Sequence, residues 1–271
     1  MVWLWIGTVA VVFVLARALR TTLDAPPLRR VNYAGRDVVT AGGIVAVVGF
    51  ALSLGVASVA GWTEANLAFP SAVAVFGFAA IGLFDDVIGS HTARGFRGHV
   101  AALRRGELTS GMAKLVAGVG VAGVTSVALS EGVAHRLLNV VVIAGAANVA
   151  NLLDLRPARA YKAAVVVSIG LLVATRGDDL VTSELWFVAA IAGLLPAELR
   201  EELMLGDTGS NAMGAALGVA VVCACTSSTG WLLLAAGVVV VINIAGEVVS
   251  FGRVIDSVAP LRAFDRLGRR P

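Results

Sequence analysis

Long apolar stretches recur along the whole chain, and only short polar turns separate them. Most of them approach the ~20 residues that a helix needs to cross about 30 Å of hydrocarbon. The pattern predicts an all-α polytopic integral membrane protein with about nine transmembrane helices, in a single domain over residues 1–252 that is followed by a basic tail over 253–271. The nine segments are about 2–19, 38–60, 70–84, 111–130, 137–153, 162–175, 185–199, 210–228 and 231–251.

Composition supports this pattern, because 58% of the 271 residues are hydrophobic, 14% are charged and the mean hydropathy is +0.88. These values exclude an ordinary soluble domain. The first residues, Met1–Trp5, carry no basic group, and no small-residue cleavage site follows them. We therefore expect a retained first helix and not a signal peptide.

The basic residues predict the orientation in the membrane, since cytoplasmic loops carry an excess of Lys and Arg. With the N-terminus outside and the C-terminus in the cytoplasm, 19 of the 21 basic residues fall on the inner side, and only Arg136 and Arg176 fall outside. The sixth segment is the weakest, because Ala163 to Thr175 is short enough for a re-entrant piece. If it failed to cross, Arg200 and Asp207 would move to the outer face.

Four aspartates stand at the ends of apolar segments: Asp85, Asp86, Asp154 and Asp207. Carboxylates at membrane depth are costly and usually mark function, although a solvated pair at the surface is the plain alternative for Asp85 and Asp86. With nine crossings all four emerge on the cytoplasmic side. Acidic and basic groups at one face indicate a divalent cation that holds phosphates, and Mg²⁺, with Mn²⁺ as an alternative, prefers such oxygen ligands.

Two further motifs lie at the ends of apolar segments. Gly206–Asn211 opens the eighth segment, where small residues would let a diphosphate approach free N–H groups at a helix start. The plain alternative is that Asp207, Thr208 or Ser210 caps the helix. Asn148, Asn151 and Asp154 recur every three residues and so share one helix face, where they form either a site or a hydrogen-bonded helix–helix contact.

Together these motifs resemble the polyprenyl-phosphate N-acetylhexosamine-1-phosphate transferases, a family that includes the phospho-N-acetylmuramoyl-pentapeptide translocase and the GlcNAc-1-phosphate transferases. The paired aspartates Asp85–Asp86, the Asn-x-x-Asn-x-x-Asp motif ending at Asp154, and the Gly-Asp-x-Gly-Ser motif of Gly206–Ser210 match in order. The first polar loop, Asp24–Gly43, and Lys114 also resemble the family.

The resemblance implies a Mg²⁺-dependent enzyme of a bacterial-type plasma membrane, with its active site on the cytoplasmic face. It would move a sugar 1-phosphate from a UDP-sugar to a polyprenyl phosphate and release UMP for cell-envelope glycan synthesis. Membrane lipids surround it, a homodimer is left open, and no nucleic-acid partner is expected. The expected catalytic residues are Asp85, Asp86, Asp154 and Asp207, with the metal on Asp86 and Asp207. The expected substrate-binding residues are Arg36, Lys114, Asn148, Asn151, Arg156, Arg159, Gly206, Thr208, Gly209 and Ser210.

The chain also departs from the family. After Asp154 the family usually continues Gly-x-Asp-Gly-Leu-Ala, whereas this chain has Leu155–Ala160, which contains a proline and two arginines. Guanidinium groups bind phosphate or carboxylate, so we expect Arg156 or Arg159 either to face a phosphate or an acidic sugar, or only to orient the helix. The family's histidine-rich loop is missing, and the three histidines, His91, His99 and His135, lie elsewhere.

Two other functions remain open from the sequence. A lipid or solute transporter with a carboxylate cluster would carry ionisable residues within its helices, and an inactive family member would serve as a binding subunit. The basic loop 94–105 is expected to act through positive-inside charge alone. The tail around Pro260–Leu267 is expected to form a short interfacial helix with its basic residues toward lipid headgroups.

Overall fold

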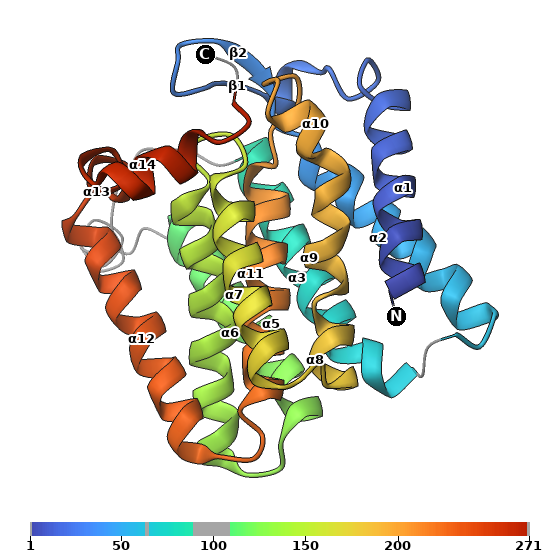
Figure 1. The fold of residues 1–271 in the computed structure, drawn as a ribbon, viewed down its shortest axis with the longest axis vertical. Helices are drawn as coiled ribbons and strands as arrows, with labels where there is room; N and C mark the ends of the chain where they lie inside the picture. The colour runs from blue at the N-terminus through green and yellow to red at the C-terminus, as the bar shows by residue number, and fades with distance from the viewer. Residues whose placement is uncertain (1, 63–64, 89–108, 270–271) are drawn as a thin grey trace.

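The computed structural model describes residues 2–62, 65–88 and 109–269, and the basic loop 94–105 lies outside these ranges. Most of the described chain forms helices that run along the long axis of the molecule (Figure 1). The long helices are α1 (Val2–Ala18), α2 (Gly42–Val59), α3 (Ala65–Ile88), α5 (Ser110–Leu129), α6 (Val133–Leu153), α7 (Arg159–Ala174), α11 (Gly206–Ala224) and α12 (Thr229–Val248).

Shorter elements complete the fold. Between α7 and α11 the chain forms α8 (Asp179–Glu184), α9 (Trp186–Ile191), the 3₁₀ turn η2 (Ala192–Leu194) and α10 (Leu195–Glu198). Between α1 and α2 lie the 3₁₀ turn η1 (Pro26–Leu28) and an antiparallel hairpin of β1 (Arg29–Val31) and β2 (Asp37–Val39), in which Arg30 pairs with Val38. The chain ends with α13 (Phe251–Ser257) and α14 (Ala259–Arg266).

Six segments of the described chain are long and apolar enough to cross a membrane, and they indicate a membrane-embedded all-α protein: 42–59, 69–88, 111–129, 133–153, 179–198 and 229–248. Three helices fall outside this group. Helix α1 is apolar but has 17 residues, α7 has 16 residues, and α11 opens with the polar run Gly206–Asn211.

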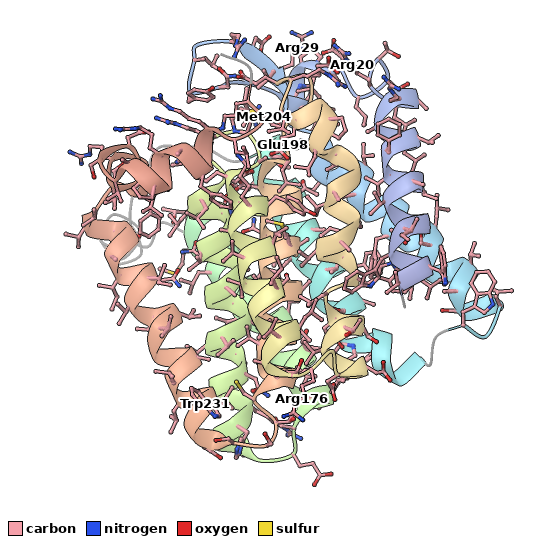
Figure 2. The ribbon with its side chains drawn as sticks, in the orientation of Figure 1. Arg20, Arg29, Arg176, Glu198, Met204 and Trp231 are labelled. Atoms are coloured by element: carbon pink, nitrogen blue, oxygen red, sulfur yellow. The ribbon has the colours of Figure 1, made fainter. Side chains whose placement is uncertain are left out.

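The two ends of the bundle differ. Arg20, Arg29, Glu198 and Met204 lie at the end that carries the β-hairpin and α14, which we call the hairpin end, whereas Arg176 and Trp231 lie at the opposite end (Figure 2). At the hairpin end, backbone hydrogen bonds join the chain before α11 to the N-terminal hairpin. The Met204 N–H donates to the Val39 carbonyl at 2.8 Å, and the Met204 carbonyl accepts from the Gly42 N–H at 2.9 Å.

Helix α11 lies at the centre of the bundle, in contact with α2, α3, α6 and α7. Nearly all of its residues from Thr208 to Cys223 are buried, and many of them are glycine or alanine. Small residues allow helix backbones to approach closely, which is the usual basis of helix packing within membranes. The central helix therefore holds the surrounding helices at short range.

The observed elements refine the expected ones at four places. The first residues of the expected segment 38–60 belong to β2, and α3 continues past residue 84, so that Asp85 and Asp86 lie within its last turns. The expected segment 185–199 is a broken run of α8 to α10. The tail forms two helices that begin at Phe251, instead of one helix near residue 260.

Candidate active site

A close approach of α3 and α11 creates the centre of the site. A Cβ atom on Gly82 would lie 2.2 Å from the Asp207 carbonyl oxygen, so only glycine fits between the two backbones. One turn further along α3, Asp85 and Asp86 reach the start of α11. Gly206, which opens α11, has φ +70° and packs against the Thr40 carbonyl, so it too must be glycine.

Asp86 caps α11 from the neighbouring helix. Its side chain is 8% exposed, and it accepts hydrogen bonds from the Asp207 N–H at 3.0 Å, the Thr208 N–H at 2.8 Å and the Thr208 hydroxyl at 2.6 Å. A helix start leaves N–H groups that need such acceptors. The alternative in which Asp207, Thr208 or Ser210 caps the helix is therefore wrong, and Asp86 occupies two of the N–H groups expected to bind a diphosphate.

Lys114 joins two carboxylates that lie far apart in the sequence. Its Nζ atom is 2.9 Å from Asp85 Oδ2 and 2.5 Å from Asp207 Oδ2. The three side chains are 18–27% exposed (Asp85 18%, Lys114 19%, Asp207 27%), so solvent reaches each of them. These contacts place Asp207 at the same end of the bundle as Asp85.

Asn151 extends this cluster from α6. Its amide nitrogen lies 3.4 Å from Asp207 Oδ2, and its amide oxygen lies 3.4 Å from the buried Ser210 hydroxyl. Asn148, one turn earlier, instead donates to Asn243 of α12 at 2.6 Å. Of the two asparagines, Asn151 therefore belongs to the site and Asn148 to a helix–helix contact.

Asp154 and Glu198 form an acidic pair behind Asp207. Asp154 Oδ1 and Glu198 Oε2 are enclosed and make no hydrogen bond within the described part of the chain. Burial raises the pKa of Asp154 well above its usual range, and the carboxylates of Glu198 and Asp207 act in the same direction. Glu198, 1% exposed, was missed from the sequence, where it is an ordinary glutamate at the end of an apolar run.

Arg156 and Arg159 are paired with the tail. Arg156 donates to both carboxylate oxygens of Asp256 at 2.9 and 2.7 Å, and Arg159 donates to both oxygens of Asp265 at 2.8 and 3.0 Å. Arg159 and Asp265 are each 4% exposed. The expectation that Arg159 faces a phosphate is therefore wrong, and Asp265 docks α14 on the protein.

The hairpin contributes two arginines, of which Arg30 contacts a site residue. Arg36, expected at the substrate, forms an ion pair with Glu201, and its side chain remains 57% exposed. Arg30 was not among the expected site residues, and its guanidinium donates to the Asp86 carbonyl oxygen. Thr208 and Gly209 are buried. Within the Gly-Asp-x-Gly-Ser motif, the side chain that solvent reaches is that of Asp207.

Within the described ranges there is no group of three or more His, Cys, Asp or Glu side chains arranged to hold a metal ion. Mg²⁺ at phosphate-transfer sites is usually held by one or two carboxylates together with the phosphates of the substrate. Asp85 and Asp207 are such a pair, because both face the same cation, Lys114 Nζ. Asp86 does not fit the expected metal role, since three donors already occupy its oxygens.

No model of a known protein family matches this chain, and no curated protein matches it. Function is therefore inferred from the residues that the structure brings together. The contact between Lys114, Asp85 and Asp207 is the most informative of these, because it combines charge, partial exposure and a position at one end of the bundle.

Proposed function

We propose that this protein is a membrane phosphoglycosyltransferase that moves a sugar 1-phosphate from a UDP-sugar to a polyprenyl phosphate and releases UMP. The observation that carries the proposal is the Lys114 bridge between Asp85 and Asp207. Lys114 bridges two partly exposed carboxylates, and such carboxylates suit a cation that enters together with a phosphate substrate. The order of motifs along the sequence supports the same family of reactions.

Asp85 and Asp207 would hold Mg²⁺, and Asn151 would stand beside them. Bound there, the ion would neutralise charge that develops on the phosphate groups. Lys114, whose ammonium now contacts both carboxylates, would be free to bind the diphosphate if a cation took over their charge. Asp86 would keep its present partners and fix the start of α11.

The bond changes in the transfer are simple. An oxygen of the acceptor phosphate attacks the phosphorus that bears the sugar, and a new P–O bond forms. The bond from that phosphorus to the bridging oxygen breaks, and UMP leaves with the electron pair. The acceptor phosphate is already largely deprotonated near pH 7, because the second phosphate pKa lies at about 6. The site therefore needs to position and neutralise charge more than to remove a proton.

We further propose nine crossings, with the hairpin end in the cytoplasm. The inner position of 19 of the 21 basic residues supports this orientation. Single cysteines at Asp179 and at Arg266, in a chain whose Cys223 and Cys225 are replaced by alanine, test it in intact cells. We expect an impermeant thiol reagent to label position 179 and not position 266, and the reverse pattern would overturn the orientation.

Turnover is tested with the purified full-length protein. A panel of UDP-sugars is mixed with a polyprenyl phosphate and Mg²⁺, and UMP release is measured with and without EDTA. We expect one or a few donors to release UMP only when the metal and the acceptor are both present. Binding of a UDP-sugar without release would instead identify a binding subunit.

Transport is the second candidate because of Glu184. This residue is 0% exposed within the segment 179–198, and neither carboxylate oxygen makes a hydrogen bond inside the described part of the chain. Buried ionisable groups in membrane segments often lie on transport paths. Glu184→Gln distinguishes the candidates. If the protein is the transferase, this variant should release UMP at a rate within about twofold of the parent. For comparison, a tenfold change in rate corresponds to about 1.36 kcal/mol.

A further inference from the structure

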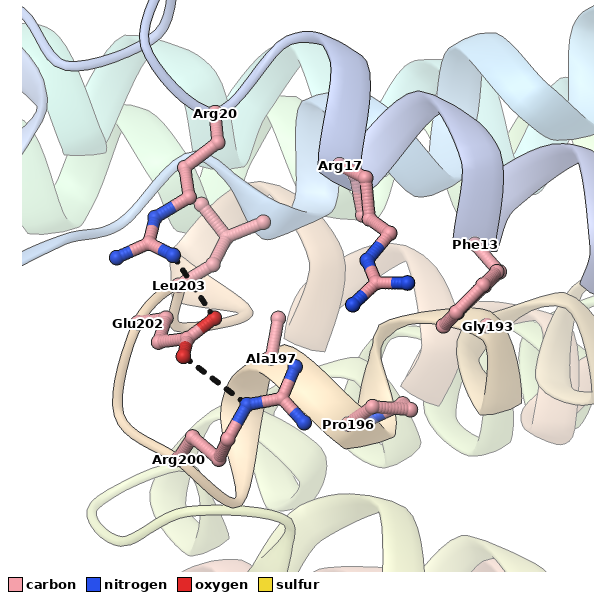
Figure 3. Close-up of a pocket in the computed structure, with 10 residues that line it drawn as sticks. Phe13, Arg17, Arg20, Gly193, Pro196, Ala197, Arg200, Glu202 and Leu203 are labelled. Carbon is pink, nitrogen blue, oxygen red and sulfur yellow. Dashed lines mark hydrogen bonds and ion pairs between the residues drawn. The ribbon is translucent and has the colours of Figure 1, made fainter.

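A cationic hollow lies at the hairpin end, and its lining includes none of the site aspartates. It occupies about 380 Å³ between the end of α1 and the η2–α10 corner. Figure 3 shows the side chains of Arg17, Arg20 and Arg200 directed into this space, with Glu202 between two of them. Phe13 and Pro196 form part of its apolar wall.

The charges in this hollow are not balanced. Glu202 accepts from Arg20 at 3.1 Å and from Arg200 at 3.0 Å, so one carboxylate positions two guanidinium groups. Arg17 lies over the Phe13 ring at 5.1 Å and makes no ion pair in the described ranges. Each guanidinium has five N–H donors in a planar fork, and most of them remain available for an anion.

An apolar hollow of about 400 Å³ lies further along α1, where α7 and α9 face it, and is lined by Ile6, Val9, Leu172 and Val188 among others. Val9, Phe13 and Arg17 follow one another at intervals of four and therefore share one face of α1. The apolar hollow lies toward the N-terminal half of α1, and the arginines lie at its C-terminal end. On α1, Ile6 is 54% exposed and Val14 62% exposed, as lipid-facing residues would be.

We propose that this seam binds an anionic phospholipid, with its phosphate among Arg17, Arg20 and Arg200 and an acyl chain in the apolar hollow. Guanidinium groups bind phosphate oxygens through paired, charge-assisted hydrogen bonds. A soluble phosphate would use only the arginines, whereas a phospholipid would also fill the apolar hollow further along α1. The site is separate from the proposed transfer reaction and does not depend on it.

Binding is measured by native mass spectrometry of the full chain released from detergent micelles doped with phosphatidylglycerol or phosphatidylcholine. We expect retained phosphatidylglycerol and little phosphatidylcholine. Arg17→Gln and Arg200→Gln should each weaken retention about tenfold, because each removes charge-assisted bonds to phosphate. Arg253→Gln is the matched control, since Arg253 is an exposed arginine of α13 with no part in the hollow, and it should change retention less than twofold.

Circular dichroism checks that each variant folds. If Arg200→Gln does not fold, Arg17→Gln decides, because Arg17 holds no ion pair within the described residues. Equal retention of both lipids, or retention unaffected by Arg17→Gln, would overturn the proposal. Competition by inorganic phosphate alone would reduce the site to an anion site, and stronger retention of a polyprenyl phosphate would assign the seam to that lipid. None of these readouts involves UMP release, so the proposed reaction can fail independently.

Discussion

Two ionic clusters at the hairpin end balance their charges in different ways. In the tail cluster, Arg156 and Arg159 each meet one aspartate through two hydrogen bonds of 2.7–3.0 Å, to Asp256 and Asp265. In the site cluster, the single ammonium of Lys114 serves both Asp85 and Asp207. In the tail cluster Arg269 also pairs with Asp265, so the guanidinium groups outnumber the carboxylates. In the site cluster a lysine bridges two carboxylates.

This difference indicates what each cluster does. Paired forks of Arg and Asp are geometrically complete, and the buried pair of Arg159 and Asp265 leaves no room for a ligand. The lysine of the site cluster is a flexible point charge that can change partners. Buried, forked pairing is typical of a structural contact, and a lysine between partly exposed carboxylates is typical of a site that receives a charged ligand.

The largest expected effect separates the clusters directly. Asp207→Asn keeps size but removes charge from the site cluster, and we expect UMP release to fall at least about a hundredfold, since metal-assisted charge stabilisation contributes several kcal/mol. Asp256→Asn makes the same change in the tail cluster and should leave turnover within about twofold. Equal losses from the two variants would show that the clusters do not differ in function.

The adjacent aspartates of α3 should respond in opposite ways. Asp86→Asn places an amide against N–H donors of α11, and we expect it to lower the free energy of unfolding by about 1–3 kcal/mol. Asp85→Asn should leave thermal unfolding nearly unchanged and lower turnover about tenfold or more, by loss of one carboxylate from the metal pair. A stable, inactive Asp86→Asn would instead return Asp86 to the metal.

Removal of Asp265 should release the tail without disturbing the site. Asp265→Asn leaves the 4%-exposed Arg159 without its carboxylate, and an unpaired buried charge is strongly unfavourable. We expect α14 to detach, seen as cleavage by a protease in the tail, while the Tm of the bundle falls by less than about 5 °C. Asp256→Asn, whose partner Arg156 is partly exposed, should release the tail less readily.

The smallest effect concerns pH. Burial acts to raise the pKa of Asp265, but the hydrogen bonds and charges of Arg159 and Arg269 outweigh it and hold the pKa below its ordinary value of 3.8. A lowered pKa means that docking of the tail is fully stabilised above that ordinary value and is lost as pH falls through the lowered pKa. Protease sensitivity of the tail should therefore rise only below about pH 4, and no change there would contradict this role for Asp265.

Apolar patterning was sufficient to predict a helical membrane protein, and the ends of the apolar runs predicted that Asp85, Asp86 and Asp207 would meet. The division of labour between Asp85 and Asp86 was not predictable, because adjacent residues differ by only about 100° of helix rotation and the sequence does not show which faces α11. Asn148 and Asn151 are three residues apart, yet their partners lie on different helices.

The partners of Arg156 and Arg159 could not be predicted from the sequence, because they are set by tertiary contacts. Their partners Asp256 and Asp265 lie about a hundred residues away, and the tail reads from sequence as a separate basic segment. Glu198 was missed for the same reason, since only the folded chain brings it behind Asp207.

The bonds that tie Met204 to Val39 and Gly42 have a consequence for biosynthesis. The first polar loop leaves the ribosome early, but its partner before α11 is made only after more than half of the chain. Asp86 likewise has no α11 N–H groups to bind until that helix is made. A nascent or truncated chain that ends before residue 204 therefore leaves the Asp86 carboxylate without its α11 donors and the Gly42–Gly43 backbone without its partners.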